Sequence, residues 1–231
     1  MKFLRSYIGS RSACVWSWVF CALALYHTQL TAQSIEFVLR DTEGQPVPDA
    51  VIELLLPSDL RAGYQSRTSH VVDQLDKEFV PHVTAVVAGN EVSFPNSDAI
   101  LHHVYSFSPA RSFNIPLYGR GESNDYVEAF PDSGVVEIGC NIHDWMLAYI
   151  YVGESNLMAI TDAEGAASLK ELPVGDYELR IWHARIDAAD NVMTQTVTLQ
   201  QGISTAVELQ VPLQRDRRIR RAPSADRSRY R

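Results

Sequence analysis

Cysteine is scarce in this sequence, which excludes a fold built on a network of disulfide bonds. The 231 residues contain three cysteines, and Cys14 and Cys21 lie in a short apolar stretch near the N-terminus. Basic residues precede that stretch and small or polar residues follow it, a pattern typical of a secretory signal peptide, expected here at 1–33. Cleavage leaves Cys140 as a lone thiol that cannot form an internal disulfide.

Long hydrophobic runs are also missing. The apolar run from Ala13 to Tyr26 is shorter than the roughly 18 residues of a confident membrane span. We therefore expect an exported, periplasmic protein with no stable membrane span after cleavage. A retained N-terminal anchor is the alternative.

Positive charge is scarce in the body of the chain. Between Ser34 and Leu213 there are 9 Lys and Arg against 26 Asp and Glu, a net charge of −17. An acidic body argues against nucleic-acid binding and favours basic partners. Residues 214–231 reverse the balance with 8 Arg against 2 Asp, and they lack apolar periodicity, so a disordered Arg-rich tail is expected over 213–231.

The motifs of hydrolytic and phosphoryl-transfer enzymes are absent, since the sequence has no G-x-S-x-G, no P-loop and no paired-carboxylate signature. Convincing helical periodicity is also absent after residue 33. Short β-branched and aromatic runs alternate instead with turn residues, which predicts an all-β protein. The segment 108–124, rich in Ser, Pro, Gly and Asn, is expected to be a long loop. The expected strands are 35–40, 50–56, 83–88, 91–94, 102–107, 125–130, 135–138, 147–152, 158–161, 167–169, 177–182, 192–199 and 205–211.

One short stretch gathers three metal-binding side chains. Cys140, His143 and Met146 have the spacing C-x2-H-x2-M, so one tight loop can direct all three at one point. A thiolate, two imidazoles and a weak thioether form a mononuclear blue-copper site. Either His102 or His103 offers the missing imidazole, and strand alternation sends these two neighbours to opposite faces. The pattern favours a copper electron-transfer protein.

Residues 79–152 resemble the cupredoxins, the family of plastocyanin, pseudoazurin and amicyanin. The resemblance rests on Phe79-Val80-Pro81, Val83–Gly89, Val92-Ser93-Phe94-Pro95-Asn96, "HHVYSF" at 102–107 and "CNIHDWM" at 140–146. As a whole the chain looks like the exported cupredoxin-type proteins often labelled methylamine utilization protein.

The resemblance implies a Greek-key β-sandwich, placed here at 63–156, with one type 1 copper. The family's first copper histidine follows its conserved Phe by eight residues, which selects His102 to join Cys140, His143 and Met146. The ligand set favours a carrier of single electrons, and the sequence has no second His-rich cluster for the further metal centre of a copper redox enzyme, so a non-enzymatic role is expected. The acidic body suggests a redox protein such as a basic cytochrome c or a dehydrogenase as partner. The alternatives are a copper delivery or sensing protein, and a structural or adhesive β-module that binds no copper.

Two positions depart from the family pattern. His103 stands where cupredoxins usually carry Asn or Thr, and Asp144 stands where amicyanin-like loops often carry Pro. A carboxylate at Asp144 is expected to favour the protonated form of its neighbour His143.

The flanking segments resemble carboxypeptidase regulatory-like domains, which are Ig-like β-sandwiches. The resemblance rests on Asp41, Gly44 and Pro46 within 38–51, on "T-D-A-x-G" at 161–165 and on "L-P-x-G-x-Y" at 172–177. It implies one discontinuous seven-stranded sandwich from 34–62 and 157–212, with the cupredoxin inserted in one of its loops. In the alternative, two domains follow each other and residues 34–56 add strands to the cupredoxin.

Overall fold

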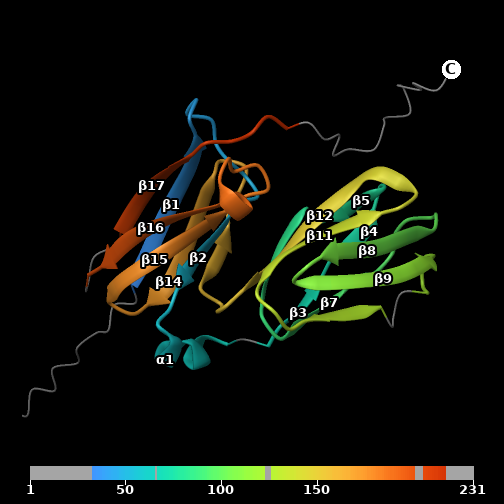
Figure 1. The fold of residues 1–231 in the computed structure, drawn as a ribbon, viewed down its shortest axis with the longest axis horizontal. Helices are drawn as coiled ribbons and strands as arrows, with labels where there is room; N and C mark the ends of the chain where they lie inside the picture. Colours follow the sequence, from blue (N-terminus) through green and yellow to red (C-terminus); the bar gives the residue numbers. More distant parts are fainter. Residues whose placement is uncertain (1–32, 66, 123–125, 201–204, 217–231) are drawn as a thin grey trace, which may run out of the picture. The chain divides into compact units, whose positions relative to one another are not determined.

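A computed structural model describes residues 33–65, 67–122, 126–200 and 205–216 of the protein (Figure 1). Strands dominate, and helix is confined over these ranges to α1 (Ser58–Arg61), η1 (Ala62–Tyr64) and η2 (Ala189–Asn191). No helix in the described part of the chain has the length and apolar character needed to cross a membrane. The prediction of an all-β protein is confirmed. The predicted signal peptide lies outside the described residues, apart from Gln33 at its end.

One group of strands draws on both ends of the described chain. It forms two sheets with the orders β14-β1-β17 and β13-β2-β15-β16. Strand β1 pairs antiparallel with β14 and parallel with β17, while β2 pairs antiparallel with β13 and β15. Strands from before residue 56 therefore share sheets with strands from after residue 157. Their bounds are β1 Gln33–Asp41, β2 Val51–Leu55, β13 Met158–Ile160, β14 Ala166–Leu172, β15 Gly175–Trp182, β16 Val192–Leu199 and β17 Thr205–Val211.

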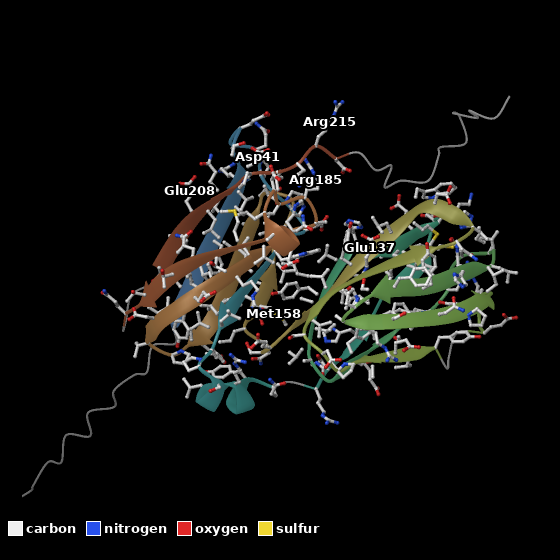
Figure 2. The ribbon with its side chains drawn as sticks, viewed as in Figure 1. Asp41, Glu137, Met158, Arg185, Glu208 and Arg215 are labelled. Carbon is white, nitrogen blue, oxygen red and sulfur yellow. The ribbon has the colours of Figure 1, made fainter. Side chains whose placement is uncertain are left out.

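Alternation of apolar and polar residues builds the core of these sheets. In β1, Ile35, Phe37 and Leu39 are fully buried while the intervening Glu36 is exposed, as expected for a strand with one face on a core. The opposite face of these sheets carries charged side chains, such as Glu208 on β17 (Figure 2). The predicted strand, turn and strand of residues 35–56 are confirmed.

The middle of the chain forms the second group of strands. A five-stranded sheet has the order β6-β12-β11-β8-β9, a three-stranded sheet has the order β10-β7-β3, and β4 and β5 form a hairpin. Phe94, Phe130, Ile138 and Ile150 are fully buried in the core that these strands share. The bounds are β3 Ser69–Val71, β4 Asp73–Leu75, β5 Glu78–Val80, β6 Val83–Val87, β7 Asn90–Ser93, β8 His102–Ser108, β9 Arg111–Tyr118, β10 Val127–Phe130, β11 Gly134–Cys140 and β12 His143–Gly153.

The prediction of a long loop over 108–124 is wrong, because β9 occupies much of that segment and pairs antiparallel with β8. The turn-forming residues misled the prediction because they lie on the exposed positions of the strand, while Ile115 and Tyr118 are buried. Pro116 is compatible with β9 because this strand is at the edge of its sheet, where a missing backbone N–H is tolerated.

The short hairpin of β4 and β5 was also not predicted. Its turn residues Asp76 and Lys77 both have left-handed backbone conformations, with φ of 53° and 61°. Such a two-residue turn suits the twist of a hairpin, although Asn-Gly or Asp-Gly is its usual sequence. The start of the predicted tail is bonded to the segment between β15 and η2, since Leu213 bridges to Ile186 and the Gln214 N–H donates to the Arg185 carbonyl. The rest of the tail, from 217, lies outside the described residues.

Candidate metal centre

Two of the predicted ligands lie at the junction of neighbouring strands. Cys140 is the last residue of β11 and His143 the first of β12, and the two residues are paired across the antiparallel ladder. The two residues between them, Asn141 and Ile142, are exposed. Because β11 and β12 are joined so tightly, the hairpin itself holds the thiol beside the imidazole.

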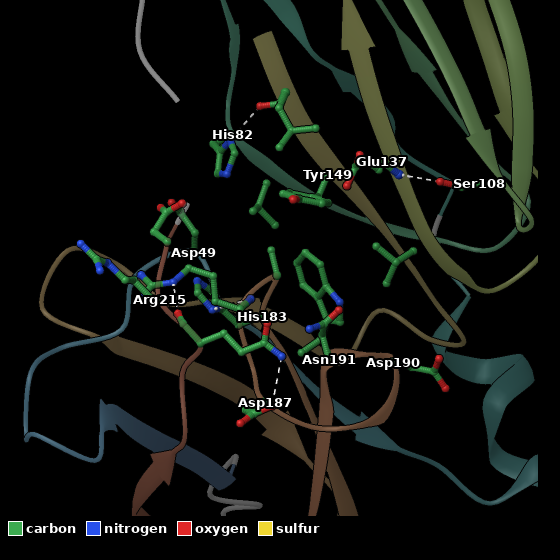
Figure 3. A pocket seen from close by; sticks show the side chains of 18 residues that line it. Asp49, His82, Ser108, Glu137, Tyr149, His183, Asp187, Asp190, Asn191 and Arg215 are labelled. Carbon is green, nitrogen blue, oxygen red and sulfur yellow. Dashed lines mark hydrogen bonds between the residues drawn. The ribbon is translucent and has the colours of Figure 1, made fainter. Parts of the chain in front are cut away.

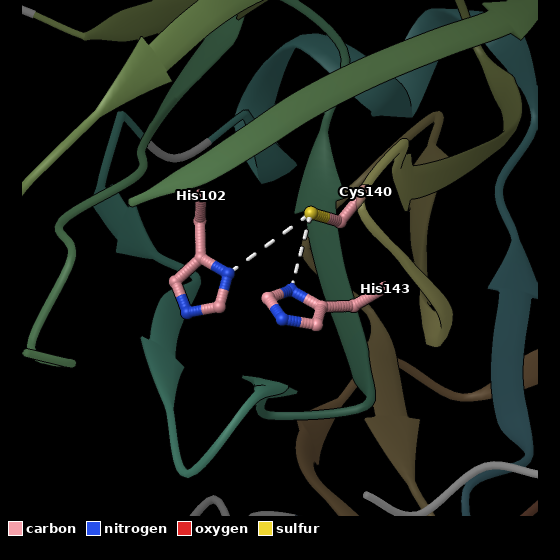
Figure 4. A group of neighbouring side chains, drawn as sticks. All are labelled: His102, Cys140 and His143. Atoms are coloured by element: carbon pink, nitrogen blue, oxygen red, sulfur yellow. Dashed lines mark hydrogen bonds between the residues drawn. The ribbon is translucent and has the colours of Figure 1, made fainter. Parts of the chain in front are cut away.

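The third group comes from the adjacent strand on the other side. His102 is the first residue of β8, which pairs antiparallel with β11. Its Nδ1 lies 4.0 Å from Cys140 Sγ, and His143 Nδ1 lies 3.8 Å from the same sulfur (Figure 4). One ligand atom from each of the three residues lies within 4.8 Å of the others. The structure thus brings together three side chains from three strand ends.

The spacing of these atoms fits a bound metal ion. With zinc-like bonds of about 2.0 Å to nitrogen and about 2.3 Å to sulfur, trigonal to tetrahedral angles place nitrogen and sulfur about 3.5–3.7 Å apart. The observed separations of 3.8 and 4.0 Å are close to that range. A small contraction of the site would complete three bonds, so the donors present suit a thiophilic transition metal.

Met146 follows on β12, three residues after His143. It is 2% exposed and belongs to the same buried cluster as Cys140, which is 3% exposed. A thioether in this apolar core is shielded from water. Among the four predicted ligands, His102, Cys140 and Met146 are buried, and only His143 is half-buried.

The structure separates the two neighbouring histidines. His103 does not join the cluster of three ligand atoms; its ring packs against Tyr105, with ring centroids 5.4 Å apart. Its Nδ1 atom is buried without a hydrogen-bond partner. Strand alternation explains the difference, because adjacent residues of β8 point to opposite faces of the sheet.

Sequence analysis missed Asp98, the residue that orients His102. Its Oδ2 atom lies 2.6 Å from His102 Nε2. A carboxylate only accepts hydrogen bonds, so Nε2 donates its proton and Nδ1 keeps its lone pair directed at the thiol. Asp98 also accepts the backbone N–H groups of Asp76 and Lys77, at 2.8 and 2.9 Å. The only signal in the sequence is an acid four residues before a histidine, which is too common to carry a prediction.

The pKa values of Asp98 and His143 are both lowered, but for different reasons. Burial raises the pKa of Asp98, but the hydrogen bonds from Lys77, His102 and Asp76 outweigh it and leave the pKa lowered. The pKa of His143 is lowered, first by burial and then by the nearby His102 and Lys77, with Asp98 opposing. The expectation that Asp144 favours a protonated His143 is therefore wrong. Asp144 is exposed, and Asp98 is the carboxylate that acts on His143.

The other histidines in the described part of the chain, His70, His82 and His183, lie outside the cluster and have structural contacts. His70 Nε2 is 2.8 Å from Thr68 Oγ1, and His82 Nδ1 is 3.0 Å from the Leu147 carbonyl oxygen. His183 Nδ1 accepts the Arg185 N–H at 3.3 Å. His82 and His183 also line a cavity of about 760 Å³ (Figure 3). None of the four predicted ligands lines that cavity, so it is separate from the candidate metal centre.

Comparison with known proteins relates part of the chain to copper proteins. No protein-family model and no curated protein sequence matches the chain. Among solved structures, a purple cupredoxin from Nitrosopumilus maritimus matches with 19% identity, 36% of this chain, 99% of its own and a TM-score of 0.33. A reduced amicyanin variant matches with 20% identity, 44% of this chain, 98% of its own and a TM-score of 0.34.

A larger copper protein also matches. The Cu-containing nitrite reductase from Thermus scotoductus SA-01 has 23% identity over 43% of this chain, with a TM-score of 0.36. The match spans only 27% of that protein. The assignment of a candidate metal centre is therefore based on the positions of His102, Cys140 and His143 and not on these matches.

Proposed function

We propose that this protein binds one type 1 copper ion and carries single electrons between redox partners without catalytic turnover. The observation that carries the proposal is the convergence of His102 Nδ1, Cys140 Sγ and His143 Nδ1 within 4.8 Å. One thiolate and two imidazoles in a plane, with a long axial thioether from Met146, are the donor set of blue-copper sites.

The chemistry of the four donors favours copper over zinc. Structural zinc sites use four strong ligands, and catalytic zinc sites use three strong ligands and an open position for water. Here the fourth candidate, Met146, is a weak thioether buried in the apolar core. A soft, weak axial ligand and a shielded thiolate suit an ion that alternates between Cu(II) and Cu(I).

The setting of the donors supports electron transfer. His102 and Cys140 are held at strand ends in the core, so the ligands need to move little when the charge of the ion changes. His143 is the half-buried member of the set. We propose its imidazole edge as the point at which electrons enter and leave.

The charge of the chain and its N-terminal sequence support a proposal for the partner and the compartment. The body of the chain, with its net charge of −17, suits a basic redox partner such as a cytochrome c or a dehydrogenase. The N-terminal pattern supports export to the periplasm. No role in nucleic-acid binding is proposed.

We also propose that the copper domain, 63–156, is inserted in a regulatory-like sandwich made from 34–62 and 157–212. Two backbone hydrogen bonds support the insertion, because they join the point where the chain leaves that sandwich to the point where it returns. Leu54 N–H donates to the Leu157 carbonyl at 2.9 Å, and Asn156 N–H donates to the Tyr64 carbonyl at 2.9 Å. A docking role for this module fits the carrier function.

Titration of the purified protein with Cu(II) tests the function. We expect one equivalent to produce an intense visible absorption band, which Cys140→Ser abolishes because the thiolate is lost. His102→Ala should also abolish the band. The matched control is His103→Ala, which removes the neighbouring imidazole outside the cluster and should leave the band intact. Colourless Cu(I) binding by the wild type would favour copper delivery, and absence of copper binding would favour a structural β-module.

A further inference from the structure

The β4–β5 turn bonds to a neighbour of each of the two candidate histidine ligands. On one side, the backbone N–H groups of Asp76 and Lys77 donate to the Asp98 carboxylate. That carboxylate accepts the hydrogen bond of His102 Nε2 through Oδ2, the oxygen that also accepts from Lys77. The turn thus reaches His102 through one side chain.

The same turn reaches the other histidine through a tryptophan. Trp145 Nε1 donates to the Lys77 carbonyl oxygen at 3.0 Å. The indole ring packs on the imidazole of His143, with centroids 5.2 Å apart and planes at 52°. The Lys77 N–H therefore donates to Asp98, which orients His102, and the Lys77 C=O accepts from Trp145, which covers His143.

The backbone of the turn gives a second reason to regard it as constrained. Asp76 and Lys77 are consecutive non-glycine residues with positive φ. Such conformations persist where surrounding bonds over-determine them, and they cluster at functional sites. Here the surrounding bonds are those to Asp98 and Trp145.

We propose that the β4–β5 turn, with Asp98 and Trp145, is an outer support that fixes both imidazole rings before a metal binds. Asp98 and Trp145 are positioning residues, since neither belongs to the ligand set. Hydrogen-bond partners of metal-binding imidazoles set their tautomer and ring orientation, and their loss typically weakens metal binding 10- to 100-fold. The expected effect on metal binding rests on the proposed copper function. The expected effect on the order of the rings does not, because it concerns the metal-free protein.

Three variants separate the parts of this support. Asp98→Asn keeps the size of the side chain but removes the charge that faces His102. Trp145→Phe keeps a ring over His143 but removes the N–H that reaches Lys77. Lys77→Gly keeps both backbone groups of the turn and suits its positive φ, so it removes only the cationic side chain. The matched control is Asp162→Asn, because Asp162 also accepts two backbone N–H groups in a turn, without a histidine.

The first readout is the order of the rings in metal-free protein, from NMR relaxation of the imidazole groups of His102 and His143. We expect Asp98→Asn to mobilise His102 and Trp145→Phe to mobilise His143, while Lys77→Gly and Asp162→Asn leave both rings as in the wild type. Thermal unfolding of each metal-free variant establishes that it is folded. Unchanged ring order in both Asp98→Asn and Trp145→Phe would overturn the proposal.

The second readout is the Cu(I) dissociation constant, measured by competition with a chromophoric chelator. We expect an increase of about 10-fold or more for Asp98→Asn and Trp145→Phe, against less than twofold for Lys77→Gly and Asp162→Asn. An increase for Lys77→Gly equal to that for Asp98→Asn would assign the effect to the lysine charge and reject the role of the turn. If the wild type binds no copper, the copper function fails and ring order alone decides this inference.

Discussion

Cys140 and His143 face each other across the final rung of the β11–β12 ladder, with Sγ and Nδ1 3.8 Å apart. Two exposed residues close the loop between them. The hairpin therefore carries three of the four proposed ligands, since Met146 also lies on β12, and β8 adds His102 from the neighbouring position in the sheet. A substitution that weakens the pairing of these strands should therefore disturb the metal centre even when all four proposed ligands are retained.

The core that contains Cys140 and Met146 should contribute strongly to stability. Phe94 is fully buried and packs on Phe113, with ring centroids 5.7 Å apart. Phe94→Ala should lower the free energy of unfolding by about 3–5 kcal/mol, because it removes buried apolar surface and leaves a cavity. Phe107 is the matched control, since it is 83% exposed on β8. Phe107→Ala should change stability by about 0.5 kcal/mol or less in the same urea titration. Equal effects of the two substitutions would contradict the placement of the core.

Met146→Leu tests the axial ligand. Leucine nearly conserves the volume of the buried side chain, so the stability cost should stay below about 1.5 kcal/mol. The visible band should persist because Cys140 and both histidines remain. The reduction potential should rise, since loss of the thioether donor weakens binding of Cu(II) more than of Cu(I). Voltammetry of both proteins checks this, and an unchanged potential would remove Met146 from the ligand set.

His143 should make the metal-free protein less stable as the pH falls. Its pKa is lowered in the folded protein by burial and by nearby His102 and Lys77. Below the unfolded value of about 6.5, the unfolded chain binds a proton that the folded chain resists, so stability decreases with falling pH until the folded pKa is passed. His143→Gln should reduce the loss between about pH 7 and 5 in chemical denaturation. An identical pH slope in the two proteins would show that His143 is not the cause.

Asp98 should lower the stability in the same direction as His143, but in a more acidic pH window. Its folded pKa lies below the ordinary value, so its contribution is present above about pH 4 and is lost as the pH falls further through the folded pKa. Because this window lies below that of His143, the two effects separate in a titration from pH 8 to 3. Asp98→Asn should remove the acidic part of the loss. It should also deepen the loss between about pH 7 and 5, because the Asp98 charge opposes the lowering of the pKa of His143.

Deletion of 63–155 with a short linker tests the insertion. The flanking strands β2 and β13 pair antiparallel, and Leu54 N–H already bonds to the Leu157 carbonyl, so a short connection suffices. Glu53 is fully buried and loses the Tyr151 hydroxyl donor in the deletion, while Arg180 remains. Carrying the deletion with Glu53→Gln avoids an under-paired buried charge. A β-sheet circular dichroism spectrum and a cooperative thermal transition are expected, and an unfolded remainder would count against the insertion.

The local part of the site was predictable from the sequence. Cys140, His143 and Met146 lie within seven residues, and the hairpin pairs Cys140 directly with His143. The all-β class was predictable for the same reason, because alternation of apolar and polar residues is a property of each strand alone. The strand β9 was not predicted, because its turn-forming residues lie on exposed positions, where they do not disrupt the packing of the strand on the core.

The outer part of the site depends on tertiary contacts. Asp98 meets Lys77 across 21 positions of sequence, and Trp145 meets Lys77 across 68. Neither contact follows from the spacing of residues, because each requires the β4–β5 turn to pack beside β8 and β12. Local periodicity and residue spacing therefore sufficed to predict the three candidate ligands at 140–146. Long-range packing decided that His102 faces the thiol, that His103 does not, and that one hairpin turn bonds to both Asp98 and Trp145.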